Sequence, residues 1–333
     1  MLLNLARQRR VLFFGGKGGV GKTTVAATVA LAEAEAGRRV LLVSTDPAHN
    51  LGHLWDRRVG PQPVRLAPHL DGLELDPDLV VAEHLAAVGA ALRRLMPEHL
   101  AGEVDRHIAL SRDAPGMQEA ALLERVAETV AQGLADHDLV VFDTAPSGHT
   151  ARLMALPEMM AAWTEGLLAR RDRAERFKTA LANLQSDEEL GERILGGNPG
   201  EGRSRDDRIR HLLNRRRERL ALLRNTLADA TKTAFIIVLA AERLPVLETL
   251  ELAAKLRATG ITVGALVVNK RTPENAGEFL AARRVQEDIH LATLAGGLPD
   301  LPRIELPLIA RDIVGREALE AFANILRGDP KTN

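Results

Sequence analysis

The stretch from Val11 to Thr24, V-L-F-F-G-G-K-G-G-V-G-K-T-T, restricts what this chain can fold into more than any other part of it. Its first four residues are all apolar, which predicts a buried strand. The glycines that follow, together with Lys22 and Thr23, fit the phosphate-binding spacing G-x-x-x-x-G-K-[ST], and a helix is expected from about Thr23. Glycine lets successive backbone N–H groups converge on an anion, and the helix directs its positive end to the same place. The stretch therefore predicts a strand, a P-loop and a helix in succession.

The residues expected to contact a nucleotide are contiguous in this P-loop. Lys22 is expected to reach the β- and γ-phosphates, and the hydroxyl group of Thr23 is expected to bind Mg²⁺. The full predicted set is Gly16, Lys17, Gly18, Gly19, Val20, Gly21, Lys22, Thr23 and Thr24.

Composition excludes several classes of function. The chain has 333 residues, a formal net charge of −1 and no cysteine. A net charge so close to zero gives no overall attraction to nucleic acid or to an anionic membrane, so no nucleic-acid partner is expected. Without cysteine there is no disulfide, no thiolate zinc site and no iron–sulfur cluster. The basic residues of the N-terminus follow a short apolar run, the reverse of a secretory signal, and no apolar run is long enough to span a membrane, so we expect a cytoplasmic protein.

Apolar runs alternate with helical patterns along much of the chain. This alternation is typical of a parallel sheet covered by helices on both faces. Strands are predicted, besides the one before the P-loop, at residues 39–44, 138–143, 233–240 and 261–269, and helices at 25–36 and 246–259. We therefore predict an α/β fold with a doubly wound, mostly parallel sheet, formed by a single domain over residues 1–330.

Two parts of the chain lack strand patterns and predict a helical subdomain, at about residues 79–115 and 150–232. Residues 79–110 are expected to form one helix and residues 118–133 another. A loose loop is expected at residues 196–205, which are rich in glycine.

The stretch from Arg203 to Arg224 is strongly basic. A nucleic-acid surface is one interpretation, but the aromatic residues that stack on bases are missing. A helix with a solvated basic face and an apolar face toward the core is favoured. The residues of that apolar face are Ile209, Leu212, Leu213, Leu220 and Leu223.

Two carboxylates follow predicted strands, at the edge of the sheet where ligands bind. Asp46 comes after the strand at 39–44, and Asp143 ends the strand at 138–143. The pattern leaves two interpretations of Asp46 open, namely a helix N-cap and a carboxylate that orients or deprotonates an attacking water molecule. Asp143 has the form of a Walker B residue, which holds Mg²⁺ through water.

The second lysine of the loop, Lys17, gives the form G-K-G-G-V-G-K-T. This form resembles the deviant P-loop of the class that contains MinD, ParA, nitrogenase iron protein and the ArsA-type ATPases. In that class the lysine crosses a dimer interface and touches the partner's nucleotide. The plain interpretation is a solvated lysine on a glycine turn, and the functional one is a positive charge supplied in trans to the transition state.

Further motifs, in the same order along the chain, resemble the ArsA/Get family of arsenite-pump ATPases and of ATPases that target tail-anchored membrane proteins. They are S-T-D-P-A-H-N-L at 44–51, L-E-L-D-P at 73–77, P-G-M-Q-E-A at 115–120, D-T-A-P-S-G-H-T-A-R at 143–152 and V-V-N-K at 267–270. The resemblance implies a homodimer that hydrolyses ATP with Mg²⁺. It gives catalytic roles to Asp46, Lys17 and Lys22, and it places Thr23, Asp46 and Asp143 around the metal, the carboxylates acting through water. It also implies that Asn269, Pro307 and Leu308 contact the adenine.

An apolar stripe in the second helical part also has two interpretations. Its residues fall near one helical face and are Leu156, Met159, Met160, Trp163 and Leu167. Such a stripe is most often an ordinary core face. The resemblance makes it a groove for the transmembrane helix of a client protein, and methionine side chains are adaptable enough for such a groove.

The chain departs from the family pattern at positions that matter for function. The zinc-binding C-x-x-C of eukaryotic members would fall near Gly277 and Leu280, so no zinc clamp is expected. One P-loop and no thiol argue against direct binding of arsenite. We predict a nucleotide-switched homodimer that captures and releases hydrophobic transmembrane helices for membrane targeting. The alternatives are an ATPase subunit of an anion or arsenite transporter, whose partner is a membrane protein, and a positioning ATPase of the ParA/MinD type.

Overall fold

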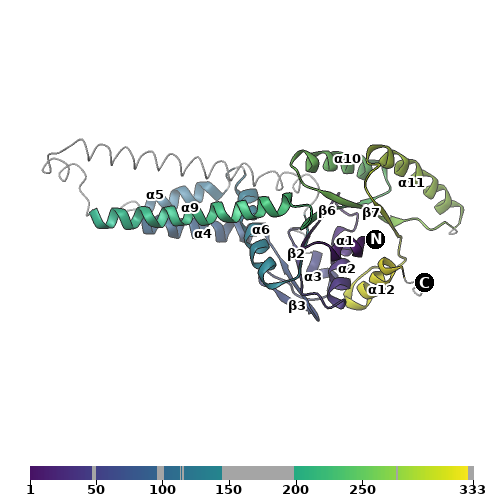
Figure 1. Ribbon diagram of the computed structural model, residues 1–333, viewed down its shortest axis with the longest axis horizontal. Helices are drawn as coiled ribbons and strands as arrows, with labels where there is room; N and C mark the ends of the chain where they lie inside the picture. The colour runs from purple at the N-terminus through teal and green to yellow at the C-terminus, as the bar shows by residue number, and fades with distance from the viewer. Residues whose placement is uncertain are drawn as a thin grey trace.

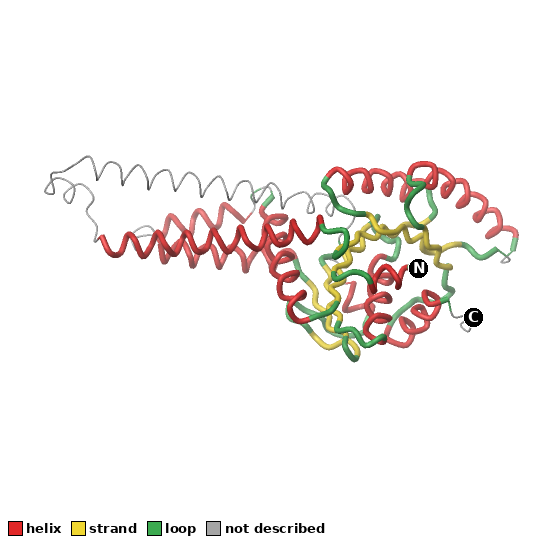
Figure 2. Tube along the Cα trace, in the orientation of Figure 1, coloured by secondary structure: helices red, strands yellow, loops and turns green. Residues whose placement is uncertain are grey.

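The computed structural model describes residues 1–46, 50–95, 101–112, 114, 116–144, 199–274 and 277–328. These residues form an eight-stranded sheet with the order β3-β4-β2-β5-β1-β6-β7-β8. Figure 2 shows the strands of this sheet in yellow. Neighbouring strands are parallel, except that β3 is antiparallel to β4. The strands are β1 Val11–Gly15, β2 Val40–Ser44, β3 Val64–Ala67, β4 Leu70–Glu74, β5 Leu139–Asp143, β6 Thr233–Ala240, β7 Val263–Arg271 and β8 Arg303–Pro307. The predicted α/β fold with a mostly parallel sheet is confirmed.

Helices cover both faces of this sheet (Figure 1). Along β1, the side chains of Val11 and Phe13 join one apolar core, while Leu12 and Phe14 join the other. Helices α4, α6, α9, α10 and α11 close the first core, and α1, α2, α3 and α12 close the second. The helices are α1 Leu2–Arg7, α2 Lys22–Glu35, α3 Asn50–Leu54, α4 Pro77–Leu95, α5 Ala101–Arg112, α6 Met117–Asp136, α9 Pro199–Ala228, α10 Arg243–Ala258, α11 Glu278–Gly297 and α12 Gly315–Arg327.

Aromatic packing fixes the point at which β1 ends. The ring of Phe13 stacks between two neighbours, with centroid distances of 4.7 Å to Phe142 and 6.3 Å to Phe235. The ring of Phe235 also covers Gly15, where an added Cβ would lie 2.4 Å from its Cζ atom. Since no larger residue fits there, the chain leaves the sheet at Gly15 and enters the P-loop.

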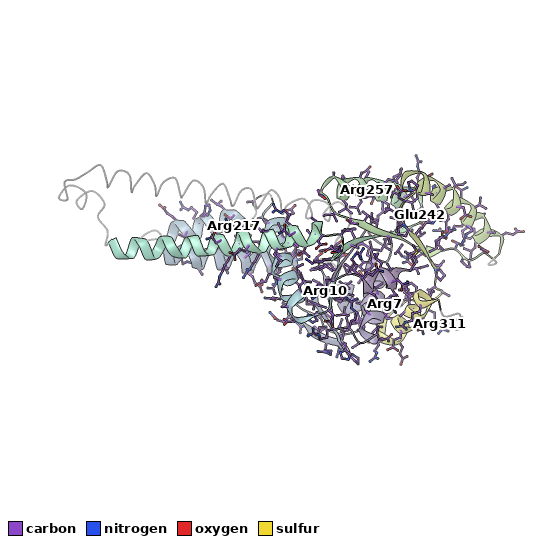
Figure 3. All side chains as sticks on the ribbon, in the orientation of Figure 1. Arg7, Arg10, Arg217, Glu242, Arg257 and Arg311 are labelled. Carbon is purple, nitrogen blue, oxygen red and sulfur yellow. The ribbon has the colours of Figure 1, made fainter. Side chains whose placement is uncertain are left out.

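Helices α4, α5 and α9 extend together away from the sheet, and we call them the helical arm (Figure 1). At its base, a carboxylate oxygen of Glu124 on α6 lies 3.0 Å from Nδ1 of His84 on α4, and the other forms an ion pair with Arg216 on α9. Leu220 of α9 is buried, whereas Arg217 is exposed to solvent (Figure 3). The described part of the basic stretch therefore has the solvated face that its sequence favoured. No described helix is both long and apolar enough to cross a membrane.

Two of the helical predictions are wrong. Residues 79–110 are not one helix, because α4 ends at Leu95, α5 begins at Ala101, and the two pack against each other. Pro97 stands between them in the sequence, and a proline inside a helix breaks it. Helix α9 begins at Pro199, inside the segment expected to be a loose loop, because proline is favourable in the first turn of a helix.

Some predictions fall outside the described residues or stay untested. The apolar stripe at 156–167 and residues 145–150 of the motif after β5 lie outside the described residues. The division into one domain with a helical subdomain stays a prediction. Strands β3, β4 and β8 were not predicted, and β4 brings a further carboxylate, Glu74, to the carboxyl edge of the sheet.

Candidate functional site

The P-loop connects β1 to α2, and its shape requires glycine at two positions. Gly16 has a φ of 143°, and an added Cβ would lie 2.0 Å from the carbonyl oxygen of Val238 on β6. Gly21 caps α2 with a φ of 89°, and an added Cβ would lie 2.4 Å from Nδ2 of Asn269 on β7. A side chain at either position would push against a neighbouring strand, so the loop and the sheet hold each other in place.

Lys22 is a buried cation at the centre of the loop. The residue is only 4% exposed to solvent, and its Nζ donates a hydrogen bond to the carbonyl oxygen of Lys17 at 3.1 Å. Burial lowers the pKa of the ammonium group, although Asp143 and Asp46 act to raise it. An ammonium group surrounded by backbone at a helix N-terminus can attract a phosphate strongly.

Thr23 and Asp143 meet at the carboxyl edge of the sheet. The hydroxyl group of Thr23 donates to Oδ2 of Asp143 at 2.6 Å. Oδ1 of Asp143 is buried and has no hydrogen-bond partner among the described residues. Burial raises the pKa of Asp143 to about 7, with further increases from the charges of Asp46 and Glu74, and with decreases from Thr23 and Lys22.

This pair fits a magnesium ion. A hydroxyl oxygen and a carboxylate oxygen are the hard ligands that Mg²⁺ accepts, and the unpartnered Oδ1 is an acceptor that a hydrated ion would satisfy. The described residues contain no group of three or more His, Asp or Glu that could hold a metal alone. That is expected for Mg²⁺, which keeps several waters and uses few protein ligands beside phosphate oxygens.

Lys17 has a partner within its own chain. Its Nζ lies 2.7 Å from Oε1 of Glu248 on α10, and each side chain is about one third exposed, at 33% and 37%. The plain interpretation of a freely solvated lysine is therefore incomplete. The ion pair is exposed enough for solvent to weaken it, so Lys17 can exchange partners at low cost.

Asp46 lies close to this group of charges. It is half-buried, its backbone N–H donates to Oγ of Ser44 at 3.3 Å, and its charge acts on both Lys22 and Asp143. Helix α3 is described from Asn50, and residues 47–49, between Asp46 and that helix, lie outside the described residues. Both interpretations of Asp46, a helix N-cap and a carboxylate that orients or deprotonates the attacking water, therefore stay open.

The carboxyl ends of β7 and β8 complete the edge. Nδ2 of Asn269 donates to the carbonyl oxygen of Val20 at 2.9 Å, and Nζ of Lys270 donates to that of Gly19 at 2.9 Å. Pro307 ends β8, and the N–H of the next residue, Leu308, donates to the carbonyl oxygen of Arg271 at 2.8 Å. Asn269 thus contacts the P-loop from the end of β7, and the Pro307–Leu308 pair stands at the end of the adjacent strand β8. Their contact with adenine stays a prediction.

Arg271 anchors this edge through three carboxylates. Its guanidinium group lies 2.5 Å from Glu287, 2.6 Å from Asp288 and 2.7 Å from Glu305. Both Arg271 and Glu287 are 4% exposed. Removing one of the two buried members, Arg271 or Glu287, leaves unpaired buried charge, which costs about 3–5 kcal/mol, whereas solvent weakens the pairs with the more exposed Asp288 and Glu305.

Comparisons with known proteins agree with this geometry. The family model for anion-transporting ATPases, ArsA_ATPase, matches residues 9–328. The chain belongs to this family. The putative arsenical pump-driving ATPase 2 of Aquifex aeolicus is 30% identical over 318 residues, which cover 95% of this chain and 99% of that protein. ATPase get3 of Aspergillus terreus is 32% identical over 95% of this chain and 90% of that protein. The arsenical pump-driving ATPase of Escherichia coli is 32% identical over 94% of this chain and 48% of that protein.

Membership in the ArsA family makes the chain an ATPase, as predicted. The names of its relatives include both pump-driving ATPases and ATPase get3, so the family alone does not decide what this ArsA-family ATPase acts on. Family membership by itself also assigns no residue to the hydrolysis step.

The raised pKa of Asp143 predicts a pH dependence of stability for this ATPase. Between its ordinary pKa of 3.8 and about 7, the folded protein keeps a proton on Asp143 that the unfolded chain has released. Because the folded state binds more protons in this window, the contribution of Asp143 to the free energy of unfolding falls as the pH rises through it. We expect Asp143→Asn to raise the Tm of the nucleotide-free protein at pH 8 and to change it little at pH 4, as measured by circular dichroism.

Asp138, on the other end of β5, provides a control of opposite sign. The hydrogen bond from Arg39 lowers the pKa of Asp138 to about 2. The charged carboxylate of Asp138 therefore stabilises the folded state fully at pH values above the ordinary pKa of an aspartate. This stabilisation is lost as the pH falls toward 2. Asp138→Asn should therefore lower the Tm slightly at pH 8. Equal Tm values for Asp143→Asn and wild type at pH 8 would show that burying the charged carboxylate of Asp143 does not destabilise the folded protein.

Sequence reasoning missed three residues of this edge, namely Glu74, Glu248 and Lys270. Glu74 lies in the motif L-E-L-D-P and Lys270 in V-V-N-K, so the motifs marked both stretches without giving either residue a role. No local pattern marks Glu248, which stands on an ordinary helix and is separated from Lys17 by 231 positions.

Proposed function

We propose that this ATPase is a homodimer, switched by Mg²⁺ and ATP, that captures and releases hydrophobic transmembrane helices of the tail-anchored type for delivery to a membrane. The absence of cysteine favours this role over the pump-driving role that the name of one relative gives. Thiolates are the soft ligands that a metalloid cargo requires, and this chain offers none. A hydrophobic helix needs only an apolar groove. A cytoplasmic location fits such a role.

In the proposed mechanism, the P-loop binds the triphosphate through its backbone N–H groups and Nζ of Lys22. The hydroxyl group of Thr23 and Oδ1 of Asp143 would hold Mg²⁺, with Asp46 joining through water. The ion would neutralise charge on the phosphate oxygens. The carboxylate of Asp46 orients the attacking water and accepts its proton. Asn269, Pro307 and Leu308 contact the adenine.

Lys17 completes the site of the other subunit. To do so its Nζ leaves Oε1 of Glu248 and reaches the partner's triphosphate as the two P-loops meet. The pairing with Glu248 in one state and with phosphate in the other links hydrolysis to a change in the dimer. A near-complete switch between two arrangements requires about 5.5 kcal/mol of differential affinity, which charge-assisted contacts to a triphosphate can supply.

The client groove in this proposal consists of Leu156, Met159, Met160, Trp163 and Leu167, which lie outside the described residues. The test is capture of a synthetic hydrophobic tail-anchor peptide by the purified protein, with a non-hydrolysable ATP analogue and with ADP. We expect a stable complex with the analogue and release with ADP. Met159→Asp should abolish capture and keep ATP hydrolysis, because a buried charge opposes binding of an apolar helix.

A matched control is Ile289→Asp, which places the same charge at an exposed apolar position on α11 (53% exposed) and should capture the peptide normally. Absence of capture by wild-type protein in both nucleotide states would refute the targeting role. Equal capture by wild type and Met159→Asp would refute the assigned groove.

The second candidate is the ATPase subunit of an anion or arsenite transporter. Its support is the Aquifex aeolicus relative, named a putative arsenical pump-driving ATPase and matched over 99% of its length. This role predicts that arsenite or another oxyanion raises ATP turnover, and that the protein binds a membrane protein rather than a free peptide. A third class, positioning ATPases of the ParA/MinD type, predicts DNA binding that weakens steeply with salt.

A further inference from the structure

Glu74 is a buried carboxylate that has no part in the proposed mechanism. It ends β4, where its Cα pairs with that of Ser44 on β2, and Ser44 pairs in turn with Asp143 on β5. Glu74, Ser44 and Asp143 therefore form one row across the carboxyl edge of the sheet. Glu74 is 4% exposed, and such burial is unusual for a glutamate unless its oxygens are bonded.

Those bonds go to the first turn of α3. Oε1 of Glu74 accepts the backbone N–H of Leu51 at 2.9 Å and that of Gly52 at 3.1 Å. The N–H groups at the start of a helix have no partner within it, and α3, Asn50–Leu54, is too short to be stable alone. Glu74 supplies the missing acceptor and adds a negative charge at the positive end of the helix.

Among the described residues, α3 packs against the second core, where Leu51 and the following Trp55 are buried beside α2. On another side α3 borders a cleft of about 680 Å³, whose lining includes Gly52, His53 and Glu74. The two hydrogen bonds to Glu74 are the contacts that we expect to hold the first turn of α3 on this side.

The position of α3 matters because the segment before it carries Asp46. At the near end of that segment, the N–H of Thr45 donates to the carbonyl oxygen of Asp143 at 2.9 Å. At the far end stands the turn that Glu74 holds. In the sequence, Asp46 directly follows Thr45 and stands four positions before Asn50, so we expect loss of the bonds to Glu74 to change where its carboxylate can reach.

We propose that Glu74 is a positioning residue for Asp46, because its carboxylate fixes the first turn of α3 and with it the segment that places Asp46 beside the γ-phosphate. This inference rests on the proposed function, in which Asp46 orients the attacking water. Because Glu74 bonds to the backbone of α3, we expect its removal to lower the rate of hydrolysis and to leave the affinity for ATP unchanged.

The test compares Glu74→Leu with Glu74→Gln. Leucine fills the space without accepting a hydrogen bond, and a misplacement of about 1 Å at a reacting group can lower the rate about 10²-fold. We expect Glu74→Leu to lower kcat by about that factor while the affinity for an ATP analogue stays unchanged. Glu74→Gln keeps an acceptor oxygen in place and should restore most of kcat. If Glu74→Leu does not fold, Glu74→Met serves instead, since methionine fills irregular space and offers these N–H groups only a weak acceptor.

Asp76→Leu is the matched control. Asp76 follows the same strand, and its Oδ1 accepts the N–H of Asp78 at 2.8 Å and that of Leu79 at 3.3 Å, so it caps α4 instead of α3. This variant should have the wild-type kcat. Hydrogen exchange provides a direct structural measurement, because the amide hydrogens of Leu51 and Gly52 should exchange faster in Glu74→Leu and remain protected in Asp76→Leu.

A double-mutant cycle separates positioning from general destabilisation. If Glu74 acts through Asp46, Glu74→Leu adds no further loss of kcat to Asp46→Asn. Additive losses, or unchanged exchange at Leu51 and Gly52, would overturn the inference. If folded Glu74→Leu keeps the wild-type kcat while Asp46→Asn loses most of it, the inference about Glu74 is wrong and the proposed function is unaffected. A wild-type kcat in Asp46→Asn would remove the proposed role of Asp46 itself.

Discussion

We expect Lys17→Ala to lower ATP turnover by about 10³–10⁵-fold, the range observed when a cation supplied to a phosphoryl-transfer transition state is removed. Binding of ATP to the monomer should remain, because Nζ of Lys17 contacts Glu248 and the loop is held together by Lys22, Asn269 and Lys270. Steady-state turnover and equilibrium binding of a fluorescent ATP analogue measure the two quantities separately. Normal turnover in Lys17→Ala would refute the role in trans.

Subunit mixing provides a sharper test of the same residue. A dimer of one Lys17→Ala subunit and one Asp46→Asn subunit has one complete site, because the Lys17→Ala subunit keeps its Asp46 and receives Lys17 from its partner. Turnover should therefore reappear when the two inactive variants are mixed. If Lys17 acts within its own subunit, mixing restores nothing. Glu248→Gln is the control for the pairing seen here, and it should raise turnover at low protein concentration because it releases Lys17 for the partner.

The second large effect is expected for Asp46→Asn. An amide cannot accept a proton from the attacking water, so turnover should fall by about 10²–10⁴-fold, the usual contribution of a general base. Binding of ATP and Mg²⁺ should persist, because Thr23 and Asp143 keep their geometry. The variant should therefore accumulate as an ATP-bound dimer, visible by size-exclusion chromatography with light scattering.

Asp138→Asn serves as the control for this variant, since it removes a carboxylate at the amino end of β5, away from the P-loop. It should hydrolyse ATP at the wild-type rate and return to the same oligomeric state as wild type. Wild-type hydrolysis by Asp46→Asn would instead show that another group handles the attacking water.

The central strands were predictable because their burial is complete. Every residue of β1, β2 and β5 is buried, so each appears in the sequence as an apolar run, which in β2 and β5 ends in one polar residue. The outer strands carry polar residues, some of whose partners come from distant parts of the chain. Asp71 of β4 lies beside His137, and Glu305 of β8 pairs with Arg271. Such strands have no apolar pattern, and only the folded structure explains them.

The candidate site shows the same contrast between local and distant contacts. The P-loop could be predicted because its glycines, Lys22 and Thr23 are contiguous and act through backbone geometry. The contacts that tune it join residues far apart in sequence. Thr23 meets Asp143 across 120 positions, Lys17 meets Glu248 across 231, and Asn269 meets Val20 across 249. Spacing cannot reveal pairs of this kind.

The end of β7 determines which part of the molecule can move during an ATP cycle. Asn269 and Lys270 hold two carbonyl groups of the P-loop, and the next residue, Arg271, is buried among carboxylates of α11 and β8. Since disturbing such a cluster is expensive, we expect the backbone of the phosphate loop and the outer strands β7 and β8 to move little during an ATP cycle. The other half of the edge has no such cluster among the described residues, and its five-residue helix α3, which borders a cleft, depends on Glu74 for its place.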